Sequence, residues 1–438
     1  MPDISVLPQD GRPSGWYELL PPPAPARHLS GRQSADWIVV GAGFAGLAAA
    51  RRLGELAPNS RIALIEAQRV GLGASGRNSG FIIDLPHLSD TASLAGREEN
   101  LRIIRLNRFA IAWLKELTET HQIRCDWARK GKYQIVATER GAKLGESFCD
   151  MLRSLGEPYQ AYGQDRMAER LGTRRIFHAV HTPDCILMNP AALVRGLGET
   201  LPANVDLFED TPVTSIDYGP PHRLTTPHGE IGAPKLILAT NGFTTGWGFL
   251  RQHLIRMVTY ASLTEPLSDT QIAGMGSDHN WGATCSVRMG TTLRRTADNR
   301  LMVRNSWRYG GNTAVSDGEI ARARRHHIAS LKRRWPQLGE PRIAHIWAGF
   351  ICLSKNGAPY WGELAPGVLA AICQNGVGAA KGTYQGRAIA EYALGLETDL
   401  VRDMSLFPKP VKHGLGPLVG PVMIGKFRFD ELRAGPDR

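Results

Sequence analysis

One glycine-rich turn constrains the fold of this chain more than any other feature, because the segments on either side fix its geometry. Residues 37–40 form an apolar run typical of a buried parallel strand, and residues 47–53 form an Ala-rich helical pattern. Between them, Gly41, Gly43 and Gly46 have GxGxxG spacing. The first permits a tight turn, the second a close backbone approach to a pyrophosphate, and the third close packing of helix on strand. The sequence therefore predicts a βαβ unit whose helix N-terminus faces a dinucleotide phosphate.

A second apolar run, residues 61–67, contains an acid near its end. Glu66 lies 20 residues after Gly46. An acid at this place can accept hydrogen bonds from the ribose hydroxyls of an adenosine. It would repel a 2′-phosphate, so the pattern disfavours NADP. NAD and FAD both carry an adenosine pyrophosphate, and this motif does not choose between them.

A second glycine-rich stretch, GLGASGRNSG, occupies residues 71–80 and contains no acid. Its small residues would let the chain run close past a pyrophosphate. Ser75 and Asn78 offer short hydrogen-bonding side chains, and Arg77 adds positive charge. On spacing alone, this stretch only suggests a longer cofactor whose second half lies beyond the pyrophosphate.

Composition excludes several classes of protein. The chain has 438 residues, enough for two domains, and a net charge of +11. The charge predicts a solvated basic surface or an anionic ligand, and no nucleic-acid motif accompanies it, so no nucleic-acid partner is expected. Six scattered cysteines without a CxxC pair fit a reducing cytoplasm and indicate neither disulfides nor a metal site. No run of 18 apolar residues predicts a membrane span, and the Pro-rich start lacks a signal-peptide core.

Several segments together resemble one family, over roughly residues 15–400. The resemblance is to the D-amino-acid-oxidase (DAO) superfamily of FAD enzymes, and within it to the gamma-glutamylputrescine oxidase-like subgroup. The segments that carry it are WIVVGAGFAGLAAARRL (37–53), IEAQRVGLGASGRNSGF (65–81), TYASLTEPL (259–267), LRRTADNRLMV (293–303), WAGFICLSKNGAPYWGEL (347–364) and QNGVGAAKGTYQGRAIAEYALG (374–395).

This resemblance implies an α/β fold of the glutathione-reductase-2/DAO type. A Rossmann-like FAD-binding domain would carry an inserted substrate domain, of α+β type, built on an antiparallel sheet. The predicted division is an extended N-terminal arm (1–36), a discontinuous FAD-binding domain (37–87, 185–246 and 342–400), a substrate or cap domain (88–184 and 247–341) and a C-terminal tail (401–438).

The resemblance also implies a noncovalent FAD and the residues that hold it. Sarcosine-oxidase-like relatives attach FAD through a cysteine in the region of Cys352, but the local pattern departs from theirs, and we expect a buried structural thiol. A helix N-terminus after residue 376, with Lys381 beside it, would stabilise the reduced anionic flavin. The cofactor residues implied are Gly41, Gly43, Phe44, Ala45, Gly46, Glu66, Ala67, Gly73, Ala74, Ser75, Arg77, Asn78, Ser79, Gly80, Val213, Ala239, Asn241, Gly242, Trp247, Asn375, Gly376, Val377, Gly378 and Lys381.

The implied reaction is oxidation of an amine or amino acid. Hydride would pass from the carbon bearing the nitrogen to flavin N5, and the imine would then hydrolyse, with O2 as acceptor. The positive charge favours an anionic substrate such as an N-substituted glycine, an iminodiacid or a gamma-glutamyl amine. Three alternatives stay open: a dehydrogenase subunit that passes electrons to a partner protein, a flavoprotein that modifies tRNA, and an NAD enzyme with the same βαβ motif. The oligomeric state is not predicted.

Six residues are candidates for the substrate pocket. Arg294 could bind a carboxylate bidentately, or form a structural salt bridge. Asp84 and His87 follow the second glycine stretch and could clamp an amine, or cap a loop. Lys355 could meet an anionic substrate or assist oxygen reduction, or lie in solvent. Tyr260 and Asn305 complete the set as residues of the predicted substrate sheet, with scaffold roles as their alternative.

Overall fold

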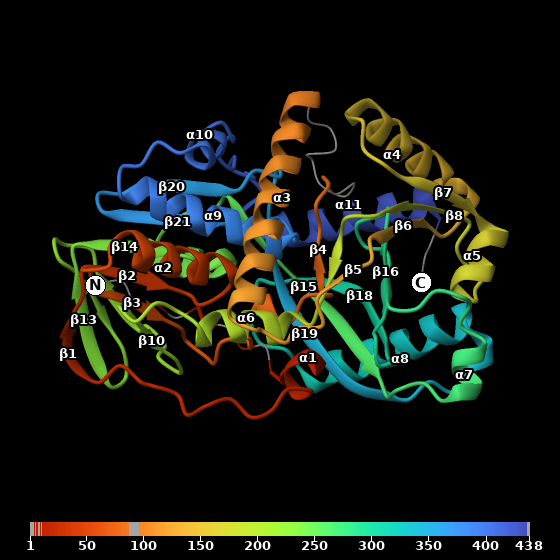
Figure 1. Cartoon of the computed structure of the whole chain (residues 1–438), viewed down its shortest axis with the longest axis horizontal. Coiled ribbons are helices and arrows are strands. Elements are labelled where there is room, and N and C mark those ends of the chain that lie inside the picture. The colour runs from red at the N-terminus through yellow and green to blue at the C-terminus, as the bar shows by residue number, and fades with distance from the viewer. Residues whose placement is uncertain (1–3, 5, 8, 10, 87–95, 436–438) are drawn as a thin grey trace.

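The computed structural model describes residues 4, 6–7, 9, 11–86 and 96–435. Two large sheets lie side by side, with the long helix α3 (Arg97–Thr120) between them (Figure 1). This is the mixed α/β architecture expected from the sequence. No helix in the described part of the chain is both long and apolar enough to cross a membrane.

The first sheet has six strands and contains the predicted βαβ unit. Its first five strands are parallel, and the edge strand β20 is antiparallel to its neighbour. The apolar runs at 37–40 and 62–65 are buried because both faces of this sheet are covered. In spatial order the strands are β10 (Val205–Phe208), β3 (Ile62–Ile65), β2 (Trp37–Val40), β14 (Lys235–Leu238), β21 (Val368–Ile372) and β20 (Tyr360–Ala365).

Helices cover one face of this sheet and a small sheet covers the other. Ile38 and Ile65 share a core with Ile216, Leu224 and Ile231 of the small sheet. The helices are α2 (Phe44–Leu56), α6 (Pro190–Glu199), α9 (Gly378–Ala393) and α10 (Asp399–Ser405), and the small sheet is β1 (Gly31–Ser34), β13 (Gly229–Ala233), β12 (His222–Thr225) and β11 (Ser215–Asp217).

The second large sheet has eight strands, all antiparallel to their neighbours except for the parallel pair β16–β6. Helix α8 (Asp317–Arg334) packs on one of its faces, where Leu331 and Trp335 are buried. In spatial order the strands are β19 (Ile343–Ser354), β15 (Leu254–Thr264), β18 (Leu301–Tyr309), β17 (Thr292–Arg295), β16 (Trp281–Cys285), β6 (Lys132–Val136), β8 (His178–Thr182) and β7 (Gln160–Gly163).

The remaining elements are short or peripheral. In a three-stranded sheet, residues 81–82 after the second glycine segment pair with residues 186–187, which pair on their other side with residues 128–129. The elements are α1 (Gly15–Glu18), α4 (Ala142–Leu155), α5 (Gln164–Leu171), α7 (Asp269–Ala273), α11 (Val419–Ala434), β4 (Phe81–Ile82), β9 (Ile186–Leu187) and β5 (Ala128–Arg129).

Three features of the structure differ from the predicted division or add to it. Strand β19 begins at Ile343, yet it pairs with β15 in the eight-stranded sheet rather than with the flavin-side sheet. The chain returns to the six-stranded sheet only at β20. The N-terminal arm is not extended throughout, since it contains α1 and adds β1 to the small sheet. The C-terminal tail contains α11, which packs on β18.

Candidate active site

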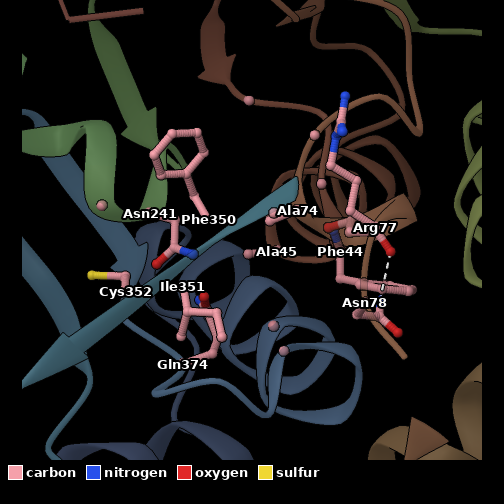
Figure 2. Close-up of a pocket in the computed structure, with 18 of the residues that line it drawn as sticks. Phe44, Ala45, Ala74, Arg77, Asn78, Asn241, Phe350, Ile351, Cys352 and Gln374 are labelled. Atoms are coloured by element: carbon pink, nitrogen blue, oxygen red, sulfur yellow. Dashed lines mark hydrogen bonds between the residues drawn. The ribbon is translucent and has the colours of Figure 1, made fainter. Parts of the chain in front are cut away.

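A cavity of about 310 Å³ lies between the six-stranded and eight-stranded sheets. Its walls come from both glycine-rich segments, from the 3₁₀ turn Asn241–Trp247, and from strands β15, β16, β17, β18 and β19. Figure 2 shows Phe350, Ile351 and Cys352 near Asn241 and Gln374, with Phe44, Ala74 and Asn78 on the other side of the view.

The first glycine turn is closed to larger side chains. A Cβ on Gly41 would lie 2.8 Å from the carbonyl oxygen of Ala239, and one on Gly46 would overlap the carbonyl oxygen of Gly41. A Cβ on Gly43 would lie 2.7 Å from the hydroxyl oxygen of Ser75, where the turn borders the cavity. Helix α2 therefore begins at the cavity with no Cβ in front of its N–H groups, which is the geometry that binds a pyrophosphate.

Glu66 lies at one end of the cavity, next to Gln68 and Val213. Its Oε2 accepts a hydrogen bond from the Ala42 N–H at 2.7 Å, and its Oε1 accepts one from the Gln68 N–H at 3.1 Å. Burial raises the pKa of this carboxyl to about 7, although both backbone bonds favour the charged form. Hydroxyl donors from a ribose would stabilise the carboxylate further, so Glu66 fits the adenosine half of a dinucleotide.

The second glycine segment is held against the first by its own side chains. Ser75 Oγ accepts a hydrogen bond from the Phe44 N–H at 3.0 Å. Asn78 Nδ2 donates to the carbonyl of Ser75 at 2.7 Å, and Asn78 Oδ1 accepts from the Gly80 N–H at 2.8 Å. These bonds fix the path of the segment, which follows the cavity from the first glycine turn toward the eight-stranded sheet.

Arg77 lines the cavity, and backbone carbonyls hold its guanidinium group. Its guanidinium donates to the carbonyls of Leu72, of Arg12 at 2.8 Å, and of Ala348 on β19 at 3.0 Å. The group is buried and has at least one further interaction. These bonds hold the glycine segment on the eight-stranded sheet, and its charge is directed at carbonyl oxygens rather than at a phosphate.

The loop before α9 closes the other end of the cavity. Gln374, Gly376 and Gly378 line it, and α9 begins at Gly378 with no side-chain cap. The positive end of this helix therefore faces the cavity and favours an anionic ring there. Asn375 does not line the cavity: its Oδ1 accepts from the Ser354 N–H at 2.9 Å, which joins this loop to β19.

Most of the predicted cofactor residues meet at this cavity. Four do not line it: Gly46 and Gly80 allow close backbone packing, Asn375 joins the loop to β19, and Lys381 lies in the first turns of α9 with its side chain off the cavity. Those that line it are Gly41, Gly43, Phe44, Ala45, Glu66, Ala67, Gly73, Ala74, Ser75, Arg77, Asn78, Ser79, Val213, Ala239, Asn241, Gly242, Trp247, Gly376, Val377 and Gly378.

The predicted substrate residues Tyr260 and Asn305 lie on the wrong face of the sheet. The Tyr260 hydroxyl donates to Glu319 of α8 at 3.1 Å, and Asn305 Nδ2 donates to Thr291 Oγ1 at 3.5 Å. Successive side chains of a strand point to opposite faces. Thr259 and Arg304, which precede Tyr260 and Asn305 in the chain, therefore point to the other face and line the cavity.

The other substrate candidates also lie off the cavity wall. Arg294 is fully buried behind it and donates to the carbonyls of Gly80 and Met188. Asp84 is buried with its Oδ2 3.6 Å from Arg108, and Lys355 is exposed. His87 lies outside the described residues.

Two arginines of the cavity wall were missed. Arg304 on β18 donates to Thr292 Oγ1 at 2.6 Å, and its guanidinium lies 5.1 Å from the centre of the Trp307 ring. Arg256 on β15 lies beside Phe243, and its Nη1 is buried without a hydrogen-bond partner in the described structure. Side chains alternate along a strand, so the direction of a single neighbouring side chain on β18 would have been enough to assign Arg304 to the cavity face. Arg256 had no such signal, because a bulge at Thr259/Tyr260 shifts the alternation of β15.

A glycine turn at the start of α2, a buried acid after the second strand and a long cavity with a second helix N-terminus at its other end fit a protein that binds a dinucleotide cofactor. The chain matches the family described as FAD dependent oxidoreductase (DAO) over residues 36–392. It therefore belongs to this family of FAD-dependent oxidoreductases, and its cofactor is FAD.

Named relatives and solved structures agree with this assignment. The chain is 26% identical over 376 residues to the probable oxidoreductase OrdL of Haemophilus influenzae, which covers 83% of this chain and 84% of that protein. It is 25% identical over 387 residues to the gamma-glutamylputrescine oxidoreductase of Escherichia coli, with 85% and 86% covered. The fold is that of glycine oxidase from Geobacillus kaustophilus, with a TM-score of 0.69, 19% identity, and 84% and 96% covered.

Proposed function

We propose that this protein oxidises a primary or secondary amine that carries a carboxylate, and that O2 is the electron acceptor. N-substituted glycines, iminodiacids and gamma-glutamyl amines are the substrate classes that fit. Bound FAD supplies the two-electron chemistry by taking up a hydride from the carbon next to nitrogen. The observation that carries the proposal is Arg304, a cation set in the cavity wall formed by the eight-stranded sheet.

The charges around the cavity support an anionic substrate. Arg304 and Arg256 line the part of the cavity formed by β15 and β18. Among the described lining residues the only carboxylate is Glu66, which belongs to the adenosine end. An arginine can bind a carboxylate through two parallel hydrogen bonds, and a low-dielectric wall strengthens them.

The apolar part of the wall supports oxidation of the amine. Phe81, Ile83, Trp347 and Phe350 also line the cavity. Such surroundings exclude water and disfavour the ammonium form of the substrate. The free amine is the form that can lose a hydride, so the wall helps to select the reactive protonation state.

The names of two compared proteins point the same way. A gamma-glutamyl amine and glycine each combine an amine with a carboxylate, and these are the compounds after which the Escherichia coli relative and the Geobacillus kaustophilus enzyme are named. The substrate class proposed here is the chemistry that the two share.

A panel of amines tests the proposal. Purified FAD-loaded protein is mixed anaerobically with N-methylglycine, iminodiacetate, gamma-glutamylputrescine and putrescine, and bleaching of the flavin absorbance is recorded. We expect carboxylate-bearing amines to reduce the flavin, with peroxide formed when air is admitted. Faster reduction by putrescine than by all three carboxylates would contradict the anionic substrate.

A second candidate differs only in the electron acceptor. Helix α11 exposes Val422, Phe429 and Leu432, and Leu418 just before the helix is also exposed, with exposed fractions of 46–65%. Such a row of apolar side chains favours contact with another protein, which could accept the electrons in place of oxygen. Reduction by the amine without reoxidation by air would select this candidate.

A further inference from the structure

Lys132 is a buried lysine whose hydrogen bonds lead to the cavity wall. Its side chain is 2% exposed, and its Nζ lies over the Phe148 ring at 5.5 Å. Nζ donates to Gln134 Oε1 at 2.8 Å and to Thr284 Oγ1 at 3.4 Å. Thr284 Oγ1 in turn donates to Gln134 Oε1 at 2.9 Å. The three polar atoms form a closed triangle behind the cavity.

Thr284 connects this triangle to the substrate side. It pairs with Gln134 across the parallel strands β16 and β6, and it lines the cavity. On β17 and β18, Thr292 and Arg304 are paired and also line the cavity. A substrate whose carboxylate is bound by Arg304 would therefore have hydroxyl groups along the same wall.

The surroundings of Lys132 place its two protonation states close in free energy. Burial lowers its pKa to about 8, opposed by the negative charge of the nearby Asp84 carboxylate. Lys132 also interacts electrostatically with His181 of β8. The Oδ2 atom of Asp84 lies 3.6 Å from Nη2 of Arg108. A lysine in this state can hold a proton or accept one near physiological pH.

We propose that Lys132 is the internal acceptor for the proton that the substrate ammonium must lose, with the Thr284 hydroxyl as the link. This inference rests on the proposed function. The neutral amine of Lys132 accepts the Thr284 hydroxyl proton while Thr284 Oγ1 accepts a proton from the substrate nitrogen. The substrate becomes a free amine, Thr284 regains its hydroxyl, and Lys132 becomes an ammonium that donates to Gln134 and Thr284. One proton moves and no electrons are exchanged.

The alternative is a purely structural lysine that satisfies Gln134. The two roles predict different pH behaviour. A structural lysine affects folding or FAD content equally at all pH values. A proton acceptor makes flavin reduction rise as pH rises through its own pKa, because only the neutral amine can accept.

The test measures anaerobic flavin reduction at low substrate concentration from about pH 6 to about pH 10. N-methylglycine, iminodiacetate and gamma-glutamylputrescine are each used as substrate. Lys132→Met and Thr284→Val are compared with wild type. Thr284→Ser keeps the hydroxyl, and Lys355→Met removes an exposed lysine off the cavity.

We expect the rising limb of wild type near pH 8, and in both Lys132→Met and Thr284→Val a shift of that limb upward by about one pH unit or more. At neutral pH the two variants should be slower by about tenfold, with most of the loss recovered at high pH. Thr284→Ser, which keeps the hydroxyl, should restore the wild-type position of the limb, and Lys355→Met should follow wild type throughout.

Each other outcome overturns the inference. An unshifted limb in both variants, a loss that is the same at every pH, or a flat wild-type profile shows that Lys132 takes no proton. If Lys132→Met does not fold, Thr284→Val decides alone. If wild type is reduced by none of the three amines, the proposed function fails first and the inference falls with it.

Discussion

Arg294 Nη1 donates a hydrogen bond at 3.0 Å to the carbonyl oxygen of Gly80, which joins the eight-stranded sheet to the second glycine segment. The same nitrogen donates to the carbonyl of Met188, and the guanidinium lies 5.2 Å from the centre of the Trp16 ring. Burial lowers the pKa of Arg294 to about 10, so it remains charged at neutral pH. Arg294, which the sequence suggested as a substrate ligand, therefore joins two parts of the fold.

Replacing Arg294 with methionine should destabilise the protein by about 2–4 kcal/mol, because two buried carbonyls lose a charged donor. The measurement is urea unfolding of the FAD-loaded protein. The folded fraction should keep its KM for a carboxylate-bearing amine. Arg223→Met, which removes an exposed arginine, is the control and should change little. A KM that rises with unchanged stability would restore Arg294 to the substrate site.

Replacing Arg304 with methionine should raise KM and leave stability almost unchanged, the opposite of what we expect for Arg294. The carboxylate would lose its cation, so KM for iminodiacetate should rise about tenfold to a hundredfold, corresponding to about 1.5–3 kcal/mol. Stability and the FAD content should change little, since Arg304 is half-buried at a cavity. Steady-state kinetics and FAD absorbance check this, and equal losses for iminodiacetate and putrescine would count against a carboxylate contact.

Gly43→Ala should weaken FAD binding without unfolding the chain. The new Cβ would lie 2.7 Å from Ser75 Oγ, a side chain that can rotate, but it would also stand where the pyrophosphate approaches α2. We expect the Kd for FAD, measured by fluorescence quenching in the apoprotein, to rise about tenfold or more. Gly163→Ala, whose Cβ would meet nothing, is the matched control. Equal FAD affinity in both variants would contradict the placement of the phosphates.

Glu66 should make the apoprotein less stable as pH rises. Its folded pKa is raised to about 7, above that of an unfolded glutamate near 4.3, so the folded chain binds more protons between the two values. Stability therefore falls by about 1–3 kcal/mol across this window and levels off above it. Urea unfolding of apoprotein at the two ends of the window measures the fall.

Glu66→Gln provides the control for that pH dependence. The variant should lose this part of the fall in stability, and it should bind FAD more weakly at alkaline pH because a carboxylate acceptor for the ribose is gone. A variant with the pH dependence of wild type would show that another group titrates.

Acid precipitation should release the flavin into the supernatant. Cys352 lines the cavity, but a hydrogen bond with Cys373 and burial both raise the pKa of its thiol well above the ordinary range. The thiolate needed to attack a flavin carbon is therefore scarce. Colour that stays in the pellet of wild type and leaves it in Cys352→Ser would prove a covalent link instead.

The dinucleotide half of the site could be predicted because its geometry is local. Gly41, Gly43 and Gly46 are needed by contacts within one turn, and Glu66 follows from the length of one helix. The substrate half depends on which face of a strand looks at the cavity. Tyr260 and Arg304 are both on predicted strands. The directions of their side chains are decided by the bulge at Thr259/Tyr260 and by the packing of α8, and neither feature can be predicted from the residues next to them in the sequence. The same holds for β19, whose partner strand lies about ninety residues away in sequence.

The alternation along β15, β17 and β18 has an evolutionary consequence. The strands present one set of side chains to the cavity, such as Thr259, Thr292 and Arg304, and a separate set to the core under α8. Mutations can therefore accumulate in the first set while the second keeps the sheet intact. A lineage could exchange one amine for another by a few substitutions at alternate positions, without a new loop or an inserted element.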